Sequence, residues 1–210
     1  MNVLRVDASI QGPASASSAL ADLVTTELVG ARPDVTVVQR HLGAEPLPAD
    51  AWATAIGAGF TPEADRTPAQ RDALALAVAL AAELRSADAV VLALPLYNWG
   101  VSQHVKTWID LVIAGGGAGT PLLEGTPTVL LTTRGGSYAP GTPKEGWDHS
   151  IGYLRRIVGD VWKADLTVIE REFTLVGVNP ALDEFTEAAT LLKKEADAAA
   201  VAAGRALAVR

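Results

Sequence analysis

The sequence of 210 residues contains no cysteine. Without a thiol the chain cannot form a disulfide, use a thiolate nucleophile or ligate an iron-sulfur cluster. It also lacks the Gly-x-Ser-x-Gly motif that carries the nucleophile of many serine hydrolases. The three histidines are far apart in the sequence and form no pair with metal-ligand spacing, so we expect no metal site. Any redox chemistry therefore needs a bound cofactor.

Long hydrophobic runs and an excess of basic charge are also missing. The longest apolar run, residues 73–82, is about half the length of a membrane span. The first ten residues include Arg5 and Asp7, unlike the apolar core of a signal peptide. The formal net charge is -7, and the seventeen Lys and Arg residues are scattered, which opposes binding to nucleic acid. We therefore expect a cytoplasmic protein that binds neither membranes nor nucleic acid.

Segments with strand-like and helix-like apolar patterns alternate along the chain. Strands are predicted at residues 3–8, 35–42, 89–94, 128–133 and 166–174. Helices are predicted around residues 20–28 and at 68–85, 101–114, 147–161 and 182–207. The stretch between Pro46 and Pro62 is rich in proline and glycine, so we expect a mobile loop or an edge of a partner interface. The alternation predicts one α/β domain over residues 1–210, built on a doubly wound parallel sheet.

A hydroxyl-rich loop, residues 9–18, follows the first predicted strand and precedes a helix. The free amides and the positive end of the helix dipole at such a junction bind anions, and a terminal phosphate would fit. The loop lacks the glycine patterns that bind dinucleotides and nucleoside triphosphates, so a mononucleotide remains. The alternative is that Ser15 or Ser17 only caps the helix.

Two further loops follow the third and fourth predicted strands. The first, Pro95–Gly100, places Tyr97 and Trp99 on either side of Asn98, and the second, Thr133–Tyr138, contains paired glycines. Each loop alone could be an ordinary turn with core or interface aromatics. In an open parallel sheet, however, the carboxyl ends of the strands line one crevice, where ligands bind. Together the loops predict a site for a planar ligand against which aromatic rings stack.

These motifs, in this order, resemble the FMN-dependent NADH-azoreductase family, which belongs with the flavodoxin-like quinone reductases. The resemblance covers nearly the whole chain and includes Tyr153–Arg156. It implies a flavodoxin-like fold with strand order 2-1-3-4-5, helices on both faces of the sheet, and a homodimer in which two subunits build each active site. It also implies bound FMN and a ping-pong transfer of two electrons from NADH or NADPH to planar acceptors, namely quinones or azo compounds.

The resemblance also assigns the cofactor contacts. The phosphate contacts are Ser9, Ser15, Ala16 and Ser17, the ring contacts are Leu96, Tyr97, Asn98 and Trp99, and the contacts on the pyrimidine side are Thr133, Arg134, Gly135 and Gly136. We expect no covalent catalyst, with Trp99 and Tyr138 as walls that stack on the substrate. The family often has Met, Phe and Ser where Leu96, Trp99 and Thr133 stand. The chain departs further at residues 159–165 and after Arg171, so the substrate side of the pocket is expected to differ.

Two alternatives remain at the level of sequence. One is an electron carrier of flavodoxin type, which binds FMN without oxidising NADH or NADPH. The other is a homologue that binds no flavin and has a structural or regulatory role. A proton donor is not obvious, because His149 and His104 are expected at the surface or in helix packing and not beside the flavin.

Overall fold

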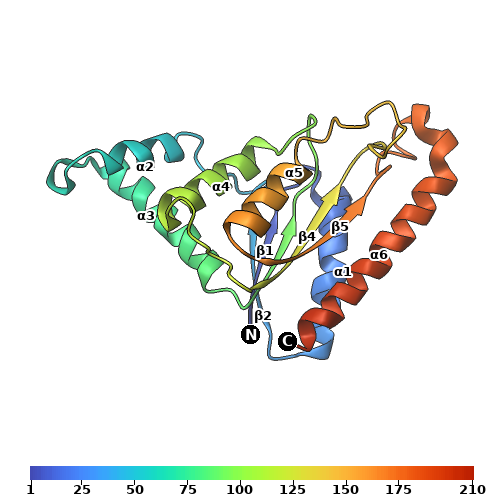
Figure 1. Cartoon of the computed structure of the whole chain (residues 1–210), viewed down its shortest axis with the longest axis horizontal. Coiled ribbons are helices and arrows are strands. Elements are labelled where there is room, and N and C mark those ends of the chain that lie inside the picture. Colours follow the sequence, from blue (N-terminus) through green and yellow to red (C-terminus); the bar gives the residue numbers. More distant parts are fainter.

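The computed structural model describes residues 1–210 and has a five-stranded sheet at its centre (Figure 1). The strands are β1 (Asn2–Asp7), β2 (Thr36–His41), β3 (Ala89–Ala93), β4 (Pro127–Thr133) and β5 (Asp165–Arg171). Their order is β2-β1-β3-β4-β5, and every neighbouring pair is parallel. The structure confirms the predicted parallel sheet and its strand order.

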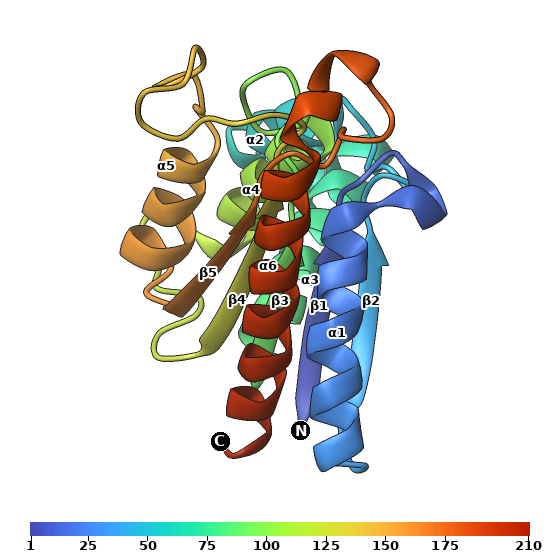
Figure 2. The same ribbon diagram turned by 90° about the vertical axis from the view of Figure 1, so that its right-hand side faces the viewer.

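Helices cover both faces of the sheet (Figures 1 and 2). The α-helices are α1 (Ala16–Ala31), α2 (Ala51–Gly59), α3 (Pro68–Arg85), α4 (Gln103–Gly116), α5 (Ile151–Leu154) and α6 (Thr186–Ala208). Helices α1 and α6 lie side by side on one face, and α2 to α5 lie on the other (Figure 2). A π-helical segment, Arg155–Val161, continues α5. None of these helices is long and apolar enough to cross a membrane.

Two hydrophobic cores explain the continuous apolar runs of the central strands. Val90 and Leu92 of β3 face the core under α3 and α4, whereas Val91 faces the core under α1 and α6. Because successive strand residues point to opposite faces, a strand covered on both sides must be apolar at every position. On the second face α6 approaches α1 so closely that a Cβ at Gly204 would lie 2.4 Å from the Val24 carbonyl oxygen.

The structure corrects four of the predicted boundaries. The crossover between Pro46 and Pro62, predicted as a loop, contains helix α2, whose small residues Ala51, Ala55 and Ala58 are buried at helical spacing. The last strand ends at Arg171 and not at residue 174, because Phe173 adopts a positive φ of 55° that an extended strand does not allow.

The third correction concerns the predicted helix 147–161. Trp147 lies outside this helix, because the Asp148 carboxylate accepts hydrogen bonds from the amides of Ser150 and Ile151 and so begins α5 only at Ile151. The predicted final helix also begins later: residues 180–185 form a 3₁₀ turn, and α6 proper starts at Thr186.

Candidate functional site

Buried serines and unpaired amides meet where β1 runs into α1. Ser9, Ser15 and Ser17 are all buried, and the Ser15 hydroxyl oxygen accepts a hydrogen bond from the Ser18 amide at 3.1 Å. Ser15 therefore caps α1. The amides of Ala16 and Ser17 take part in no hydrogen bond within the chain. Capping thus accounts for one amide of the first turn and leaves two donors at the positive end of the helix dipole.

These groups line a cavity of about 120 Å³ at the carboxyl edge of the sheet. Eight of the predicted contacts line it: Ser9, Ser15, Ala16, Ser17, Leu96, Tyr97, Thr133 and Gly135. Four lining residues were not assigned from the sequence, namely Gln11, Pro95, Thr174 and Leu175. The last two follow β5, whose carboxyl end reaches the same edge, so their place after a strand was the signal that could have found them. Asn98, Trp99, Arg134, Gly136 and Tyr138 lie outside the lining.

Tyr97 links the loop that follows β3 to the loop that follows β1. Its hydroxyl oxygen lies 3.2 Å from the Ser9 hydroxyl oxygen and accepts a hydrogen bond from the Ile10 amide at 3.1 Å. The loops that follow β1 and β3 are therefore held in a fixed relative position. This cross-link depends on the phenol hydroxyl, which a phenylalanine would lack.

A tight turn follows Tyr97. The Tyr97 amide donates to the Gly100 carbonyl at 3.1 Å and the Gly100 amide donates back at 2.9 Å, so Asn98 and Trp99 are the two central residues. Both have a positive φ, 46° and 64°. Residues other than glycine pay roughly 1–2 kcal/mol each for this conformation, and such strain concentrates at ligand sites. The amides of Asn98 and Trp99 bond nothing within the chain and are free for a ligand.

The glycine loop after β4 offers a second pair of free amides. The segment after β5 uses the loop's carbonyls, since Thr174 donates to Arg134 and Leu175 donates to Gly135. The amides of Gly135 and Gly136 remain unpaired. A Cβ at Gly135 would lie 2.6 Å from a methyl carbon of Leu175, so a larger residue would push this wall of the cavity outward.

The Arg134 side chain fixes this loop from behind. Its guanidinium lies 2.6 Å from carboxylate oxygens of both Asp148 and Glu170, and 3.7 Å from Glu172. Burial lowers the pKa of Arg134, but these carboxylates outweigh burial and raise the pKa overall. Glu172 in turn accepts a hydrogen bond from the Tyr138 amide. A contact between Arg134 and a cofactor stays a prediction, and the structure gives its side chain a positioning role.

Tyr138 and Trp99, the predicted stacking walls, lie in the loops that follow β4 and β3 and do not line the cavity. The centroid of the Tyr138 ring lies 6.0 Å from the Arg134 guanidinium carbon and 5.6 Å from the Lys144 ammonium. Burial and the charge of Asp148 raise the pKa of Tyr138, so its phenol stays protonated at neutral pH. Trp99 contacts Trp147 edge to face, with ring centroids 6.1 Å apart.

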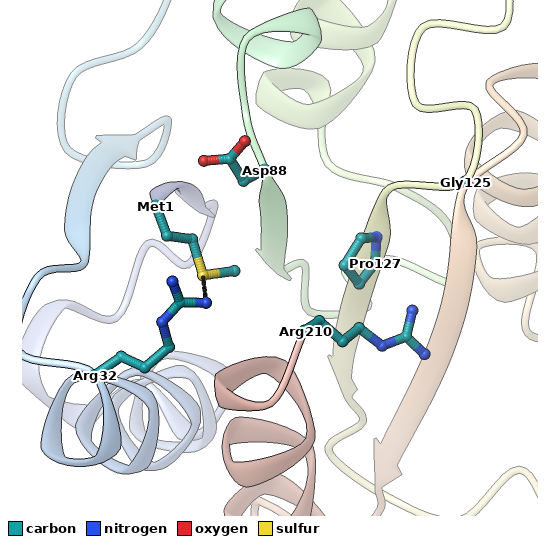
Figure 3. Close-up of a pocket in the computed structure, with 6 residues that line it drawn as sticks. All are labelled: Met1, Arg32, Asp88, Gly125, Pro127 and Arg210. Carbon is teal, nitrogen blue, oxygen red and sulfur yellow. Dashed lines mark hydrogen bonds between the residues drawn. The ribbon is translucent and has the colours of Figure 1, made fainter.

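A larger cavity, of about 540 Å³, lies at the opposite end of the sheet near both chain termini (Figure 3). Its charged side chains are already engaged: Arg32 donates to the Met1 sulfur, Asp88 accepts from the Asn2 amide, and Arg210 pairs with Asp165. It offers no aromatic wall and no free helix amides. No group of three or more His, Cys, Asp or Glu side chains in the structure is close enough to hold a metal ion.

Comparison with known proteins agrees with this arrangement. The chain matches the family model for the flavodoxin-like fold over residues 1–194. It is 39% identical over 191 residues to the FMN-dependent NADH:quinone oxidoreductase of Frankia alni, an alignment that covers 89% of this chain and 90% of that protein. The chain belongs to this family. A member from Streptomyces avermitilis is 37% identical over 212 residues, which cover 99% of this chain and 97% of that protein.

Solved structures of family members have the same fold. The azoreductase from Bacillus anthracis str. Sterne superposes with a TM-score of 0.77 at 25% identity, covering 98% of this chain and 99% of that one. An FMN-dependent NADH-azoreductase from Bacillus anthracis str. Ames Ancestor, solved in complex with FMN, gives a TM-score of 0.70 at 19% identity over 95% of this chain and 97% of that one. The resemblance deduced from the sequence motifs is therefore confirmed.

Proposed function

We propose that the protein is an FMN-dependent oxidoreductase that passes two electrons from NADH to quinones or azo compounds. The observation that carries the proposal is the set of unpaired amides around the cavity at the carboxyl edge of the sheet. Two belong to the first turn of α1, two to the Asn98–Trp99 turn and two to the Gly135–Gly136 loop. Relatives at 37–39% identity over most of the chain are FMN-dependent NADH:quinone oxidoreductases, which supports the same assignment.

The residues present fit FMN. The buried hydroxyls of Ser9, Ser15 and Ser17, with the amides of Ala16 and Ser17, match a phosphate held without a cationic side chain. At about 120 Å³ the cavity is smaller than the 300–1,000 Å³ typical of pockets that enclose a whole ligand. It would therefore hold the phosphate end of FMN.

FMN, when bound, supplies the two-electron chemistry, while the protein supplies binding, orientation and electrostatics. The amides of Asn98 and Trp99 on one side, and of Gly135 and Gly136 on the other, are fixed hydrogen-bond donors. Hydrogen-bond donors that are already oriented stabilise negative charge developing on a ligand, because they need not reorient during the reaction. Trp99 and Tyr138 would offer aromatic faces on which a planar donor or acceptor could stack.

The decisive test is anaerobic mixing of the purified protein with NADH, followed by a quinone. We expect the visible absorbance band of the flavin to bleach with NADH and to return with the quinone. NADPH in place of NADH measures the preference between donors. A protein that holds flavin but is not bleached would be an electron carrier, and a protein that takes up no flavin would have neither role.

We also propose that the protein is a homodimer in the cytoplasm, where NADH is available. Trp52, Ile56 and Phe60 form an apolar stripe along α2, at positions four residues apart, and Phe60 is 86% exposed. Helix α2 projects from the end of the molecule in Figure 1. A second subunit that covers the stripe would remove this apolar surface from water.

Light scattering coupled to gel filtration tests the dimer. We expect twice the chain mass for the wild type and the chain mass for a double variant, Ile56→Asp with Phe60→Asp. Val178→Asp, an exposed apolar position away from α2, serves as the matched control and should remain dimeric. A monomeric wild type, or a double variant that remains dimeric, would contradict this placement of the interface.

A further inference from the structure

Two exposed tryptophans, Trp99 and Trp147, pack edge to face in the segments that follow β3 and β4. The ring centroids of Trp99 and Trp147 are 6.1 Å apart and their planes cross at 72°. Trp99 is 47% exposed and Trp147 is 50% exposed, so each indole leaves about half of its surface uncovered. In contrast, the Trp108 and Trp162 pair has a similar geometry but is fully buried in the core.

The backbone holds Trp99 firmly although its ring is exposed. Trp99 is the second central residue of the turn closed by the two Tyr97–Gly100 hydrogen bonds, and its φ is 64°. Glycine is the favoured residue at this position of such a turn. Trp99 therefore adopts a backbone conformation that glycine would adopt more easily, and it brings a large flat ring to this turn.

Hydrogen bonds from the two residues that follow Trp147 fix its backbone. The amide of His149, two residues on, donates to the Trp99 carbonyl at 2.9 Å and ties the two tryptophan segments together. Asp148, the next residue, bonds the buried Arg134 guanidinium and the first amides of α5. An exposed indole with such a fixed backbone loses little freedom when a ligand binds, which favours its use as a binding surface.

Trp99 and Trp147 are each connected to residues that line the cavity. Trp99 lies two residues after Tyr97, which lines the cavity. Trp147 is joined through Asp148 to Arg134, the residue directly before the cavity-lining Gly135. We propose that Trp99 and Trp147 form an aromatic acceptor subsite beside the flavin ring, and that Trp147 favours acceptors with two fused or linked aromatic rings over acceptors with one. This inference rests on the proposed function.

The geometry explains why ring number decides. A single-ring acceptor that stacks on the flavin is covered by the flavin and by one wall. A second ring must extend past the flavin, and there it meets an indole face from one tryptophan and an indole edge from the other. Aromatic rings favour offset-stacked and edge-to-face contacts, and the two planes at 72° offer both at once. Trp147 would therefore contact the second ring of the acceptor, whereas the flavin would contact the first ring.

The test compares p-benzoquinone with the corresponding naphthoquinone as acceptors, at several NADH concentrations. We expect Trp147→Ala to lower kcat/KM for naphthoquinone about tenfold, equal to about 1.4 kcal/mol, and to leave kcat/KM for p-benzoquinone within about twofold, since only the second ring loses its contact. Trp147→Phe retains a ring and should recover most of the loss, whereas Trp147→Leu should not. Leu191→Ala, an exposed position on α6, is the control and should change neither value.

Binding without turnover gives an independent readout. With FMN bound and NADH absent, calorimetry should show that Trp147→Ala weakens 2-naphthoate more than benzoate. Equal losses for one-ring and two-ring compounds, or no loss for either, would overturn the subsite. A wild type that holds FMN but leaves NADH unoxidised would instead contradict the proposed function, and the naphthoate titration would still decide on the tryptophan pair.

Discussion

At the scale of single residues, Ser15 performs two tasks at the start of α1. Its hydroxyl oxygen accepts from the Ser18 amide and lies 3.2 Å from the Ser17 hydroxyl oxygen. The first task caps the helix, and the second places two hydroxyls beside the free amides of Ala16 and Ser17. Removal of both hydroxyls should therefore affect ligand binding more than folding.

We predict that the double variant Ser15→Ala with Ser17→Ala loses FMN and keeps its fold. Each lost hydrogen bond to a charged phosphate is worth about 1.5–3 kcal/mol, whereas the lost cap costs about 1 kcal/mol of stability. Flavin content after gel filtration and thermal unfolding of the flavin-free protein measure the two effects. Thr67→Ala removes the cap of α3, far from the site, and should lose similar stability while it keeps its flavin. Full flavin content in the double variant would refute the phosphate assignment.

The sequence allowed the grouping of Ser9, Ser15 and Ser17 at one cavity to be predicted, but not the contact between Trp99 and Trp147. Ser9, Ser15 and Ser17 lie in one loop, so the order of strand, loop and helix is enough to bring them together. Trp147 is eleven residues after Gly136 along the chain and reaches Trp99 only through contacts between loops. Its segment also fits a helical pattern, but the Asp148 carboxylate accepts from the Ile151 amide, and the helix begins later than hydrophobic spacing suggests.

At the scale of elements, the Asp148 carboxylate ties the segment between β4 and α5 to the Arg134 side chain and to the start of α5. Asp148 bonds the Arg134 guanidinium at 2.6 Å and accepts from the amides of Ser150 and Ile151 at 2.8 and 3.0 Å. Arg134 is buried, so loss of the Asp148 carboxylate would leave a buried positive charge with one ion-pair partner fewer. Glu170 remains at 2.6 Å and limits the cost.

We predict that Asp148→Ala lowers the free energy of unfolding by about 2–3 kcal/mol, since it removes a buried ion-pair partner and the helix-starting acceptor together. Asp148→Asn keeps an acceptor for the amides and should lose less. Urea unfolding of the flavin-free variants measures the difference. Asp160→Ala, which removes an exposed pair with Arg156, should cost less than about 1 kcal/mol. Equal stability of the alanine and asparagine variants would contradict the capping role.

The elements themselves were predicted unequally, and burial explains why. The strands β1, β3 and β4 and the helix α3 were placed within one or two residues, because their apolar residues are either continuous or at clear helical spacing. Helix α2 was missed because its buried residues are alanines, which give little hydrophobic contrast, and because Gly57 and Gly59 favour a loop. The end of β5 depends on a left-handed Phe173, for which the sequence gives no signal.

At the scale of the whole molecule, a buried arginine on strand β1 forms ion pairs within the sheet and with helix α1. Arg5 donates to both carboxylate oxygens of Asp7, at 2.7 and 3.0 Å, and to Asp22 on α1 at 2.6 Å. Burial alone would raise the pKa of Asp7, but the hydrogen bonds from Arg5 and Gln39 outweigh burial and lower the pKa below its ordinary value. The ionised carboxylate therefore stabilises the folded chain.

The direction of that pKa shift predicts how acid unfolds the protein. A carboxyl whose pKa is lower in the folded state contributes stability above its unfolded pKa of about 3.9, and this stability is lost as the pH falls through the folded pKa. Asp7→Asn should therefore cost about 3 kcal/mol at neutral pH and much less at strongly acidic pH. Urea unfolding as a function of pH measures it, with the exposed Asp34→Asn as control. An unchanged pH profile in Asp7→Asn would contradict the role of this pair.

The most direct measurement of the account is a titration of the flavin-free protein with FMN and with riboflavin, which has the same ring and no phosphate. If the cavity under α1 holds the phosphate, FMN should bind one per chain, and riboflavin should bind on the order of 100-fold more weakly, a difference of about 2.8 kcal/mol. Equal affinity for the two flavins, or no saturable binding of FMN, would contradict the central claim.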